Sequence, residues 1–449
     1  MNETDVIDAI DVAHERKALE QTIQEIISVA NQQEATACSV SVSKVLGLSN
    51  TVRNQEIETL EFNQDFGFGI TVYVGHQKGH ASTSDTASDS IRSTVSAALQ
   101  IARQTGADPC AGLADAELMA SDIIDLSLDH PIGLTPSMAE SYALETEQAM
   151  LDAGVASDGV TFASHRSIHG YGNSHGFCAS HVTSRHVLSA VGLAKDDNGM
   201  QRDYYYTIGR DIGQLLDTQS VGQFAAERTL NRLNSQPIKT GQYPVLLSPE
   251  ISAGVIGHIV SALSGGKLYR KASFLLDSLS KQILPSFVRI YEDPFLLKAM
   301  GSRNYDNEGV TCRAQDFISD GLVSNYLLGS YSARKLGMNT TANAGGAHNL
   351  HVSNTNHSQK DLLQQMGTGV YITEVMGQGI NLVTGDYSRG ASGFWVENGE
   401  LKHPVEGITI AGNLNQMMMG IVAIGNDIPH YLTTRTGSIL INEMTVAAE

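Results

Sequence analysis

Cysteine is scarce in this sequence of 449 residues, which contains four of them. They stand far apart and form no Cys-x-x-Cys pair, so neither a zinc cage nor a redox motif of that kind is supported. Isolated cysteines of this sort are typical of buried free thiols in a reducing compartment. We therefore predict free, buried thiols at Cys38, Cys110, Cys178 and Cys312.

Long apolar runs and targeting signals are also missing. No stretch of about 18 apolar residues occurs, so no membrane span is expected. The residues from Met1 to Val6 include no basic segment followed by an apolar one, so no secretory signal is expected either. These absences predict a cytoplasmic protein without a membrane partner.

Positive charge is in short supply. Lys and Arg total 29 whereas Asp and Glu total 48, which gives a net charge of −19. A surface this acidic repels nucleic-acid phosphates unless a local basic patch overrides it. The densest basic clusters, Lys267–Lys271 and Arg334–Lys335, are short. We expect ordinary solvated charge there and no direct contact with nucleic acid.

What remains is the composition of an ordinary globular protein, long enough for two or three domains. We predict an α+β N-terminal domain over residues 1–104, with an antiparallel sheet and helices. Apolar residues recur at helical spacing in 5–31, and a second helix is expected at about 86–104. The expected strands and turn are 37–46, 55–62, a turn at Asn63–Gly67, and Gly69–Val74.

A middle α+β domain is expected over residues 105–237, and a β-rich C-terminal domain over 238–449. The middle domain begins with a connecting region at 105–135, which is poor in pattern. The C-terminal domain is rich in glycine and turns, and Asn398-Gly399 is a strong two-residue hairpin signal. Further expected elements are helices at Ser137–Asp152 and 221–234, strands between Val160 and Ile208, and turns at Gly170–Asn173 and Asp196–Gly199.

One helix of the C-terminal domain has the frame of a metal site but few ligands. Ser248 is a good N-cap, Pro249 suits the first helical position, and Gly265-Gly266 is expected to end the helix. His258 is the one residue on it that could bind a metal. Taken alone, a single helical histidine is more often a hydrogen-bonded or surface residue than a ligand.

Six sequence blocks resemble the PmbA branch, also called TldE, of the TldD/PmbA proteins. The most specific block is EVMGQGINLVTGDYSRGASGFWVENGE, from Glu374 to Glu400. The other blocks, in chain order, are Ala81–Asp85, Gly199–Tyr204, Leu263–Asp277, Ser332–Met338 and Ile408–Leu414. The resemblance covers nearly the whole chain.

This resemblance implies a degenerate metallopeptidase helix. The TldD branch carries a His-Glu-x-x-x-His helix and a distant Cys ligand, and the PmbA branch pairs with it but lacks that set. Here His258 matches the second His of the motif, whereas Ala253 and Gly254 replace the first His and the Glu. No cysteine follows residue 312, in the region where the TldD branch supplies its ligand. We therefore expect no catalytic residue, no metal and no cofactor in this chain, and zinc in a TldD-like partner.

Other candidate motifs are weaker. Five histidines between His165 and His186 invite a metal hypothesis, but the surrounding sequence predicts strands and lacks supporting carboxylates. His348 and His351 would point to opposite faces of a strand. Glycines concentrated near residues 257–266 and 345–346 fit tight turns, or close approach of an extended peptide to a sheet edge. The peptide-binding candidates are Gly265, Gly266, Gly345 and Gly346.

The sequence favours a non-catalytic PmbA-like subunit of a TldD/TldE zinc metalloprotease complex. Its partners would be a TldD-like subunit, in a heterodimer or higher assembly, and peptide substrates, with a homodimer possible when the chain is alone. The resemblance implies proteolysis of small unfolded proteins such as antitoxins and maturation of leader-bearing peptides such as microcins. Two alternatives stay open. The chain could itself be an active metallopeptidase, or it could be a binding protein that modulates gyrase or another protein, as the family's historical description suggests.

Overall fold

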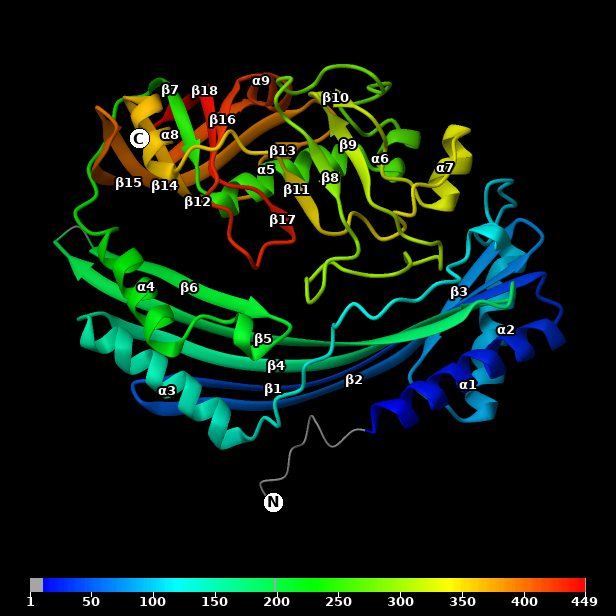
Figure 1. Cartoon of the computed structure of the whole chain (residues 1–449). Coiled ribbons are helices and arrows are strands. Elements are labelled where there is room, and N and C mark those ends of the chain that lie inside the picture. Colours follow the sequence, from blue (N-terminus) through cyan, green and yellow to red (C-terminus); the bar gives the residue numbers. More distant parts are fainter. Residues whose placement is uncertain (1–10, 198, 449) are drawn as a thin grey trace.

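The computed structural model describes residues 11–197 and 199–448. An N-terminal half holds a long antiparallel sheet with helices, and a C-terminal half consists mostly of strands (Figure 1). The predicted α+β class is therefore confirmed. No helix in these residues is both long and apolar enough to cross a membrane.

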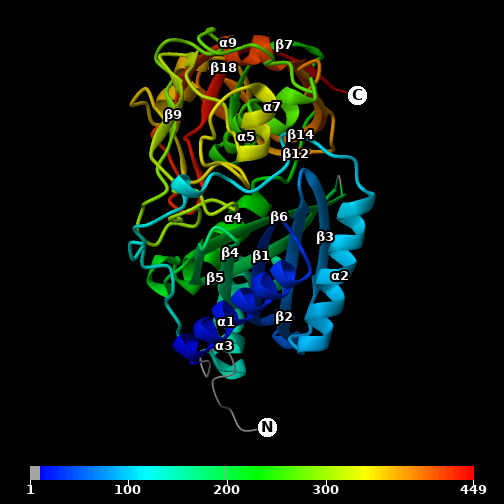
Figure 2. The same cartoon turned by 90° about the vertical axis from the view of Figure 1, so that its right-hand side faces the viewer.

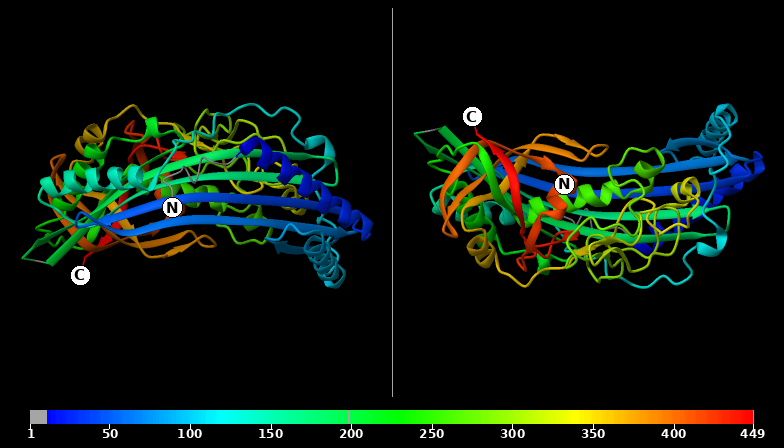
Figure 3. Two further views of the ribbon diagram at one scale, coloured as in Figure 1. Left: turned by 90° about the horizontal axis from the view of Figure 1, so that it is seen from below. Right: turned by 90° about the horizontal axis from the view of Figure 1, so that it is seen from above.

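Within the described residues, one antiparallel sheet spans the whole N-terminal half in the order β3-β2-β1-β4-β5-β6. Several strands run the length of the molecule, as Figure 3 shows from below and above. The sheet is continuous across the boundary expected at residue 104, since β1 pairs with both β2 and β4. The strands are β1 (Ala37–Arg53), β2 (Glu56–Val74), β3 (Gln77–Thr83), β4 (Ala156–Asn173), β5 (Cys178–Asp196) and β6 (Gly199–Gly209).

Helices cover the outer face of this sheet, while its inner face is turned toward the C-terminal half (Figures 1 and 2). Apolar side chains of α1 and α2 pack on one end of the sheet, and those of α3 and α4 pack on the other. The connecting region predicted at 105–135 is irregular apart from the short helix η1 (Ala116–Leu118). The other helices are α1 (Val12–Gln32), α2 (Ser88–Gln104), α3 (Pro136–Asp152), η2 (Ile212–Gln214) and α4 (Thr218–Leu230).

Two predicted turns are wrong because strand pairing overrides the local turn signal. Residues Asn63–Gly67 lie inside β2, where Asn63 pairs with Gly47. The real turn is Asn54-Gln55, whose φ angles are 56° and 60°. The buried carboxylate of Glu147 on α3 accepts hydrogen bonds from both turn amides, at 3.0 and 2.7 Å. Gly170–Asn173 likewise belongs to β4, and the chain turns just after it.

The other N-terminal elements mostly match their predictions. The first helix begins at Val12, and the part predicted over residues 5–10 lies outside the described residues. The helix expected at 221–234 is shifted to Thr218–Leu230, while α2 and α3 fall where predicted. The strand β3 was not anticipated. All four cysteines are free, but only Cys38 and Cys312 are buried, so the prediction of full burial is wrong for the other two.

In the C-terminal half, strands β12, β7, β18, β15 and β14 close into a ring because β12 also pairs with β14. The Asn398-Gly399 hairpin is confirmed, with φ angles of 53° and 76° between β14 and β15. The strands of this sheet are β7 (Gly241–Leu247), β12 (Gly369–Met376), β13 (Ile380–Asn381), β14 (Asp386–Glu397), β15 (Glu400–Asn413), β16 (Ile421–Ile424) and β18 (Ile439–Ala447).

A smaller sheet and short helices complete this half around one large apolar core. The helix α5 (Pro249–Ala262) contributes Val255, Ile256 and Ile259 to that core. The small sheet consists of β8 (Ile290–Glu292), β9 (Gln315–Ser319), β10 (Leu322–Val323), β11 (Leu350–Val352) and β17 (Thr434–Arg435). The other helices are α6 (Gly265–Tyr269), α7 (Ser330–Leu336), α8 (Gln359–Met366) and α9 (Leu414–Met419).

Candidate functional site

The helix α5 carries the degenerate metallopeptidase positions and contributes residues to both cavities described below. Pro249 occupies its first turn and Ser248 the N-cap position, as predicted, but the Ser248 hydroxyl makes no capping hydrogen bond. The helix ends at Ala262, with Leu263 as C-cap. Gly265 and Gly266 do not end it, because they form the start of α6. That prediction is wrong because Leu263 itself takes the αR conformation at the helix end.

The positions that replace the metallopeptidase ligands lie on the accessible side of α5. Gly254 is exposed, and a Cβ placed there would meet no atom within 4 Å. His258 is half-buried, with its ring centroid 6.3 Å from that of Tyr387 on β14. Burial, and then the positive charge of Arg389, lower the pKa of His258. This histidine is therefore a packed, preferentially neutral side chain.

The residues present do not fit a catalytic zinc ion. Ala253 and Gly254 carry no donor atom, whereas catalytic zinc sites use about three protein ligands. Across residues 11–197 and 199–448, no group of three or more His, Cys, Asp or Glu side chains is placed to hold a metal ion.

Four of the five histidines between His165 and His186 lie on strands, as the sequence indicated, and His175 lies in the turn between β4 and β5. His169 on β4 faces His181 on β5, with ring centroids 5.5 Å apart. Burial is the main cause that lowers the pKa of both, to about 3 for His181. His348 and His351 do not converge, because His348 lies 3.1 Å from the sulfur of Cys312 whereas His351 stacks on Tyr291.

The structure brings the four candidate glycines to one cavity of about 600 Å³, which we call the glycine cleft. Gly265 and Gly266 come from α6, whereas Gly345 and Gly346 follow α7 by several residues. The C-terminal half of α5 supplies one wall through Gly257 and Ser261. Whether this cleft binds a peptide stays a prediction.

The four glycines do not serve the same purpose. A Cβ at Gly265 would lie 2.4 Å from the Ser332 hydroxyl, and one at Gly345 would lie 2.4 Å from the Asn307 amide. These two glycines are needed for packing. A Cβ at Gly346 would meet nothing within 4 Å, and one at Gly266 would approach only the end of the Arg270 side chain. The latter pair therefore leaves open space in the cleft.

A buried carboxylate fixes the loop beside the glycine cleft. Asp306 accepts hydrogen bonds from the backbone amides of Glu308 and Ala344, both at 2.9 Å. Desolvation raises the pKa of Asp306 to about 6, although these hydrogen bonds oppose the shift. Glu308 and Ala344 both line the cleft, so Asp306 connects two of its walls.

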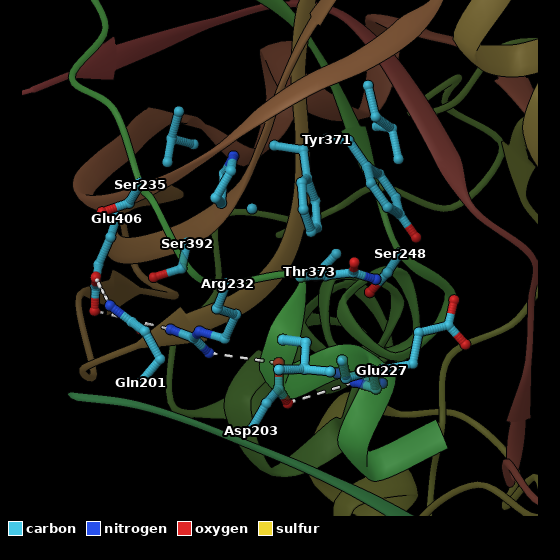
Figure 4. A pocket seen from close by; sticks show the side chains of 18 of the residues that line it. Gln201, Asp203, Glu227, Arg232, Ser235, Ser248, Tyr371, Thr373, Ser392 and Glu406 are labelled. Carbon is cyan, nitrogen blue, oxygen red and sulfur yellow. Dashed lines mark hydrogen bonds and ion pairs between the residues drawn. The ribbon is translucent and has the colours of Figure 1, made fainter. Parts of the chain in front are cut away.

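A second cavity of about 760 Å³ lies between the two halves, and we call it the charged cavity (Figure 4). One side is formed by β6 and α4 of the N-terminal half. The opposite side is formed by β12, β14 and β15 and by the N-terminus of α5. The charged residues that line it are Asp203, Glu227, Arg228, Arg232, Glu250, Lys402, Glu406 and Asp427.

Arg232 links the two halves at this cavity. Its Nη1 atom lies 2.6 Å from a Glu374 carboxylate oxygen and 3.6 Å from Asp203, and Nη2 lies 4.0 Å from Glu406. Gln201 adds a hydrogen bond to Glu406 at 2.7 Å. The Arg232 side chain is only 14% exposed, so its charge is partly desolvated. Figure 4 shows Arg232 beside Asp203, and Gln201 beside Glu406.

Two buried hydroxyls at the charged cavity have no partner in the described chain. They are those of Ser248, which is 4% exposed, and Ser392, which is 3% exposed. Both residues line the cavity. The β12–β14 ladder shifts register between Ile372 and Glu374, so Thr373 bulges toward the same space. Bulges of this kind are frequent next to functional sites.

The charged cavity was missed by the sequence analysis. Its residues come from segments more than a hundred positions apart, and no local pattern connects them. A signal was nevertheless present. Gln201 and Asp203 lie in the block Gly199–Tyr204, and Ser392 lies in the block Glu374–Glu400, both of which carry the family resemblance.

Solved structures share this fold. A protein described as a modulator of DNA gyrase from Bacteroides thetaiotaomicron superposes with a TM-score of 0.91 at 24% identity, over 96% of this chain and 99% of that one. TldE from Thermococcus kodakarensis superposes with a TM-score of 0.81 at 17% identity, over 95% and 100% of the two chains. At these levels of identity the superpositions establish a shared fold.

Sequence comparison identifies the family. The chain matches the PmbA/TldA metallopeptidase domain 1 over residues 38–102, the central domain over 129–233 and the C-terminal domain over 240–448. It is 46% identical to Metalloprotease PmbA of Escherichia coli O157:H7, over 98% of each chain. A PmbA homolog of Haemophilus influenzae is 45% identical over 96% of this chain and 97% of its own. The chain therefore belongs to the PmbA/TldD metallopeptidase family, in its PmbA branch.

Proposed function

We propose that this chain is the non-catalytic, peptide-handling subunit of a cytoplasmic zinc metallopeptidase whose catalytic subunit is TldD-like. The zinc ion and its ligands belong to the partner. The assembly acts on small unfolded proteins and on leader-bearing peptides. The chain positions the substrate and forms one wall of the space in which the partner cleaves it.

The observation that carries this proposal is the donor set of α5. The family frame is present, with Ser248 and Pro249 at its start, but Ala253 and Gly254 can neither coordinate zinc nor transfer a proton. A helix that keeps the family's start but lacks the metal ligands supports a structural role for this chain beside a catalytically active partner.

The glycine cleft supports the peptide-handling part of the proposal. Gly257, Gly266 and Gly346 leave its walls without side chains at the points where an extended chain would approach. Such approach allows hydrogen bonds between main chains, which bind a peptide largely independently of its sequence.

The test is a mixing experiment with a TldD-like protein from the same cell. We expect a mixed species at micromolar concentration by light scattering, and peptide cleavage by the mixture that exceeds the sum of the separate proteins. Elemental analysis should find zinc with the partner and none at stoichiometric level in the isolated chain. Full activity of the partner alone, with no mixed species, would contradict the proposal. The mass of the isolated chain shows whether it forms a homodimer when unpaired.

A second candidate follows from the relatives, which carry the name metalloprotease. The chain could then cleave peptides by itself. The same experiment separates the two candidates, because this alternative requires cleavage, sensitive to chelators, by the isolated chain. One tightly held zinc ion per chain would favour it as well.

A further inference from the structure

The charged cavity has apolar walls as well as charged ones. Aromatic side chains line it from both halves, namely Tyr205 and Phe224 on one side and Tyr371 and Phe394 on the other. Aromatic faces accept the methylene stem of Lys or Arg and attract the cationic head through the ring quadrupole. A volume of about 760 Å³ is within the range of sites that enclose a ligand of several residues or the size of a drug.

The balance of charge in the cavity favours a cationic guest. Five lining residues are acidic and three are Lys or Arg. Arg232 and Arg228 are already engaged by Asp203, at 3.6 and 3.4 Å. Glu250 differs, because its carboxylate accepts a hydrogen bond from the Tyr431 hydroxyl at 3.0 Å and forms no ion pair with a cation of the described chain.

The negative charge of Glu250 shifts the pKa values of neighbouring side chains. Burial, and then Glu250, raise the pKa of both Tyr431 and Tyr371. The carboxylates do not gather into a group of three or more that could hold a metal ion anywhere in the described residues. Arg228 also interacts with Glu250, because desolvation lowers the pKa of Arg228 whereas Asp203 and then Glu250 raise it above its usual value. Within the described residues Arg228 forms its ion pair with Asp203 and not with Glu250, so this carboxylate can still accept the cationic head of an organic guest.

The unpartnered hydroxyls show that the cavity is also built for a polar guest. Ser248 and Ser392 are buried, and leaving a buried hydroxyl unsatisfied costs free energy. The amides and carbonyls of a peptide main chain could satisfy both. In Figure 4 the bulged Thr373 lies between Ser392 and Ser248 on the cavity wall.

We propose that the charged cavity binds an extended peptide segment through a Lys or Arg side chain, with the aromatic walls around its stem and Glu250 at its cationic head. The inference rests on the peptide-handling role proposed above and names the substrate class. The glycine cleft then accepts main chain of any sequence, whereas the charged cavity selects a basic side chain.

The test measures binding to the isolated full-length chain by titration calorimetry. The probes are three peptides, acetyl-Ala-Ala-X-Ala-Ala-amide, in which X is Arg, norleucine or Glu. We expect the Arg peptide to bind at least about tenfold more tightly than the other two. The substitution Glu250→Gln should reduce that preference at least about fivefold. The matched control is Glu443→Gln, an exposed carboxylate on β18 that does not line the cavity, and it should leave the preference unchanged.

A second variant tests the hydroxyls. Ser392→Ala should weaken binding of the Arg peptide about two- to fivefold without lowering the midpoint of thermal unfolding, because the hydroxyl has no partner to lose. Equal binding of the three peptides, absence of binding, or an Arg preference that survives Glu250→Gln would overturn the inference. The mixing experiment is independent. If cleavage requires the chain but the Arg preference is absent, only this inference fails. If the preference is present but no mixed species forms, only the pairing fails.

Discussion

The charged cavity and the glycine cleft use the same helix in opposite ways. The charged cavity receives the N-terminus of α5, where Ser248, Pro249 and Glu250 face a set of ionised side chains from both halves. The glycine cleft receives the other end, where Gly257 and Ser261 present almost no side chain. At the charged cavity α5 contributes a charged side chain, whereas at the glycine cleft it leaves open space. The difference indicates that recognition of a side chain and acceptance of a main chain are separated along a single helix.

The largest expected effect tests how the glycine cleft is supported. Asp306 is protonated more readily in the folded state, where its pKa is about 6, than at its ordinary value of 3.8. The native state therefore binds more protons between pH 4 and 6, and this contribution to stability falls as pH rises through that window. A shift of this size corresponds to about 3 kcal/mol.

The substitution Asp306→Asn removes the titration. Urea unfolding of both proteins at pH 4, 5, 6 and 7 should show that the wild type gains stability relative to the variant as pH falls, by up to about 3 kcal/mol. Buried neutral histidines act in the opposite direction in both proteins, since the pKa of His348 is lowered to about 4. Because these histidines are the same in both proteins, their contribution cancels in the difference between variant and wild type. A difference that does not change with pH would contradict the assignment.

The next effect tests whether ion pairs hold the charged cavity together. Arg232→Met leaves Asp203, Glu374 and Glu406 without their shared cation. We expect a loss of about 2 kcal/mol in the free energy of unfolding, below the figure for a fully buried pair because two of the carboxylates are partly exposed. Arg202→Met is the control, because Arg202 is 59% exposed and pairs with Asp158 at the surface. Equal losses of unfolding free energy in the two variants would show that the ion pairs of Arg232 stabilise the protein no more than a surface ion pair does.

A smaller effect tests whether peptide passes through the glycine cleft, by comparing two glycines of α5. Gly257→Leu places a side chain in the cleft, and we expect cleavage by the mixture with a TldD-like partner to fall at least about tenfold, or about 1.4 kcal/mol. Gly254→Leu adds the same side chain three residues earlier, where it does not line the cleft. Both variants should fold, because a Cβ meets no atom within 4 Å at either position. Equal activity of the two would argue against peptide passage through the cleft.

The smallest effect concerns the residue that most resembles a ligand. His258 lines neither cavity and packs near Tyr387. His258→Ala should therefore change cleavage by the mixture less than about twofold, since a general base and metal ligands must act together. Peptidase assays with a fixed amount of mixed species measure this directly. A loss above about tenfold in a folded variant would give His258 a chemical role.

Sequence reasoning could predict the elements of this fold better than their ends. Period-two alternation identified part of β1, because one face of that strand packs on helices, whereas β3 was not anticipated. It failed at Asn63–Gly67, where turn-forming residues are held in β2 by pairing with β1. That pairing is a tertiary effect, which a local window cannot contain.

The candidate sites show the same limit. Glycine clustering predicted Gly265, Gly266, Gly345 and Gly346 one by one, but the sequence could not show that they share a cavity. It also could not separate glycines required for packing from those that leave open space, because that distinction depends on Ser332 and Asn307. The charged cavity was beyond local reasoning, since Arg232 meets Glu374 across 142 positions of the chain.

The central position of β1 in its sheet also sets the order in which the chain can fold. Ser39 on β1 pairs with Asn173 on β4, more than a hundred positions later in the chain. Pairings this distant in sequence slow folding, because a long loop must close before they form. During synthesis from the N-terminus, the β1–β2 hairpin therefore emerges with one edge unpaired until β4 follows. In that interval the unpaired edge can pair with another chain, well before α5 has been made.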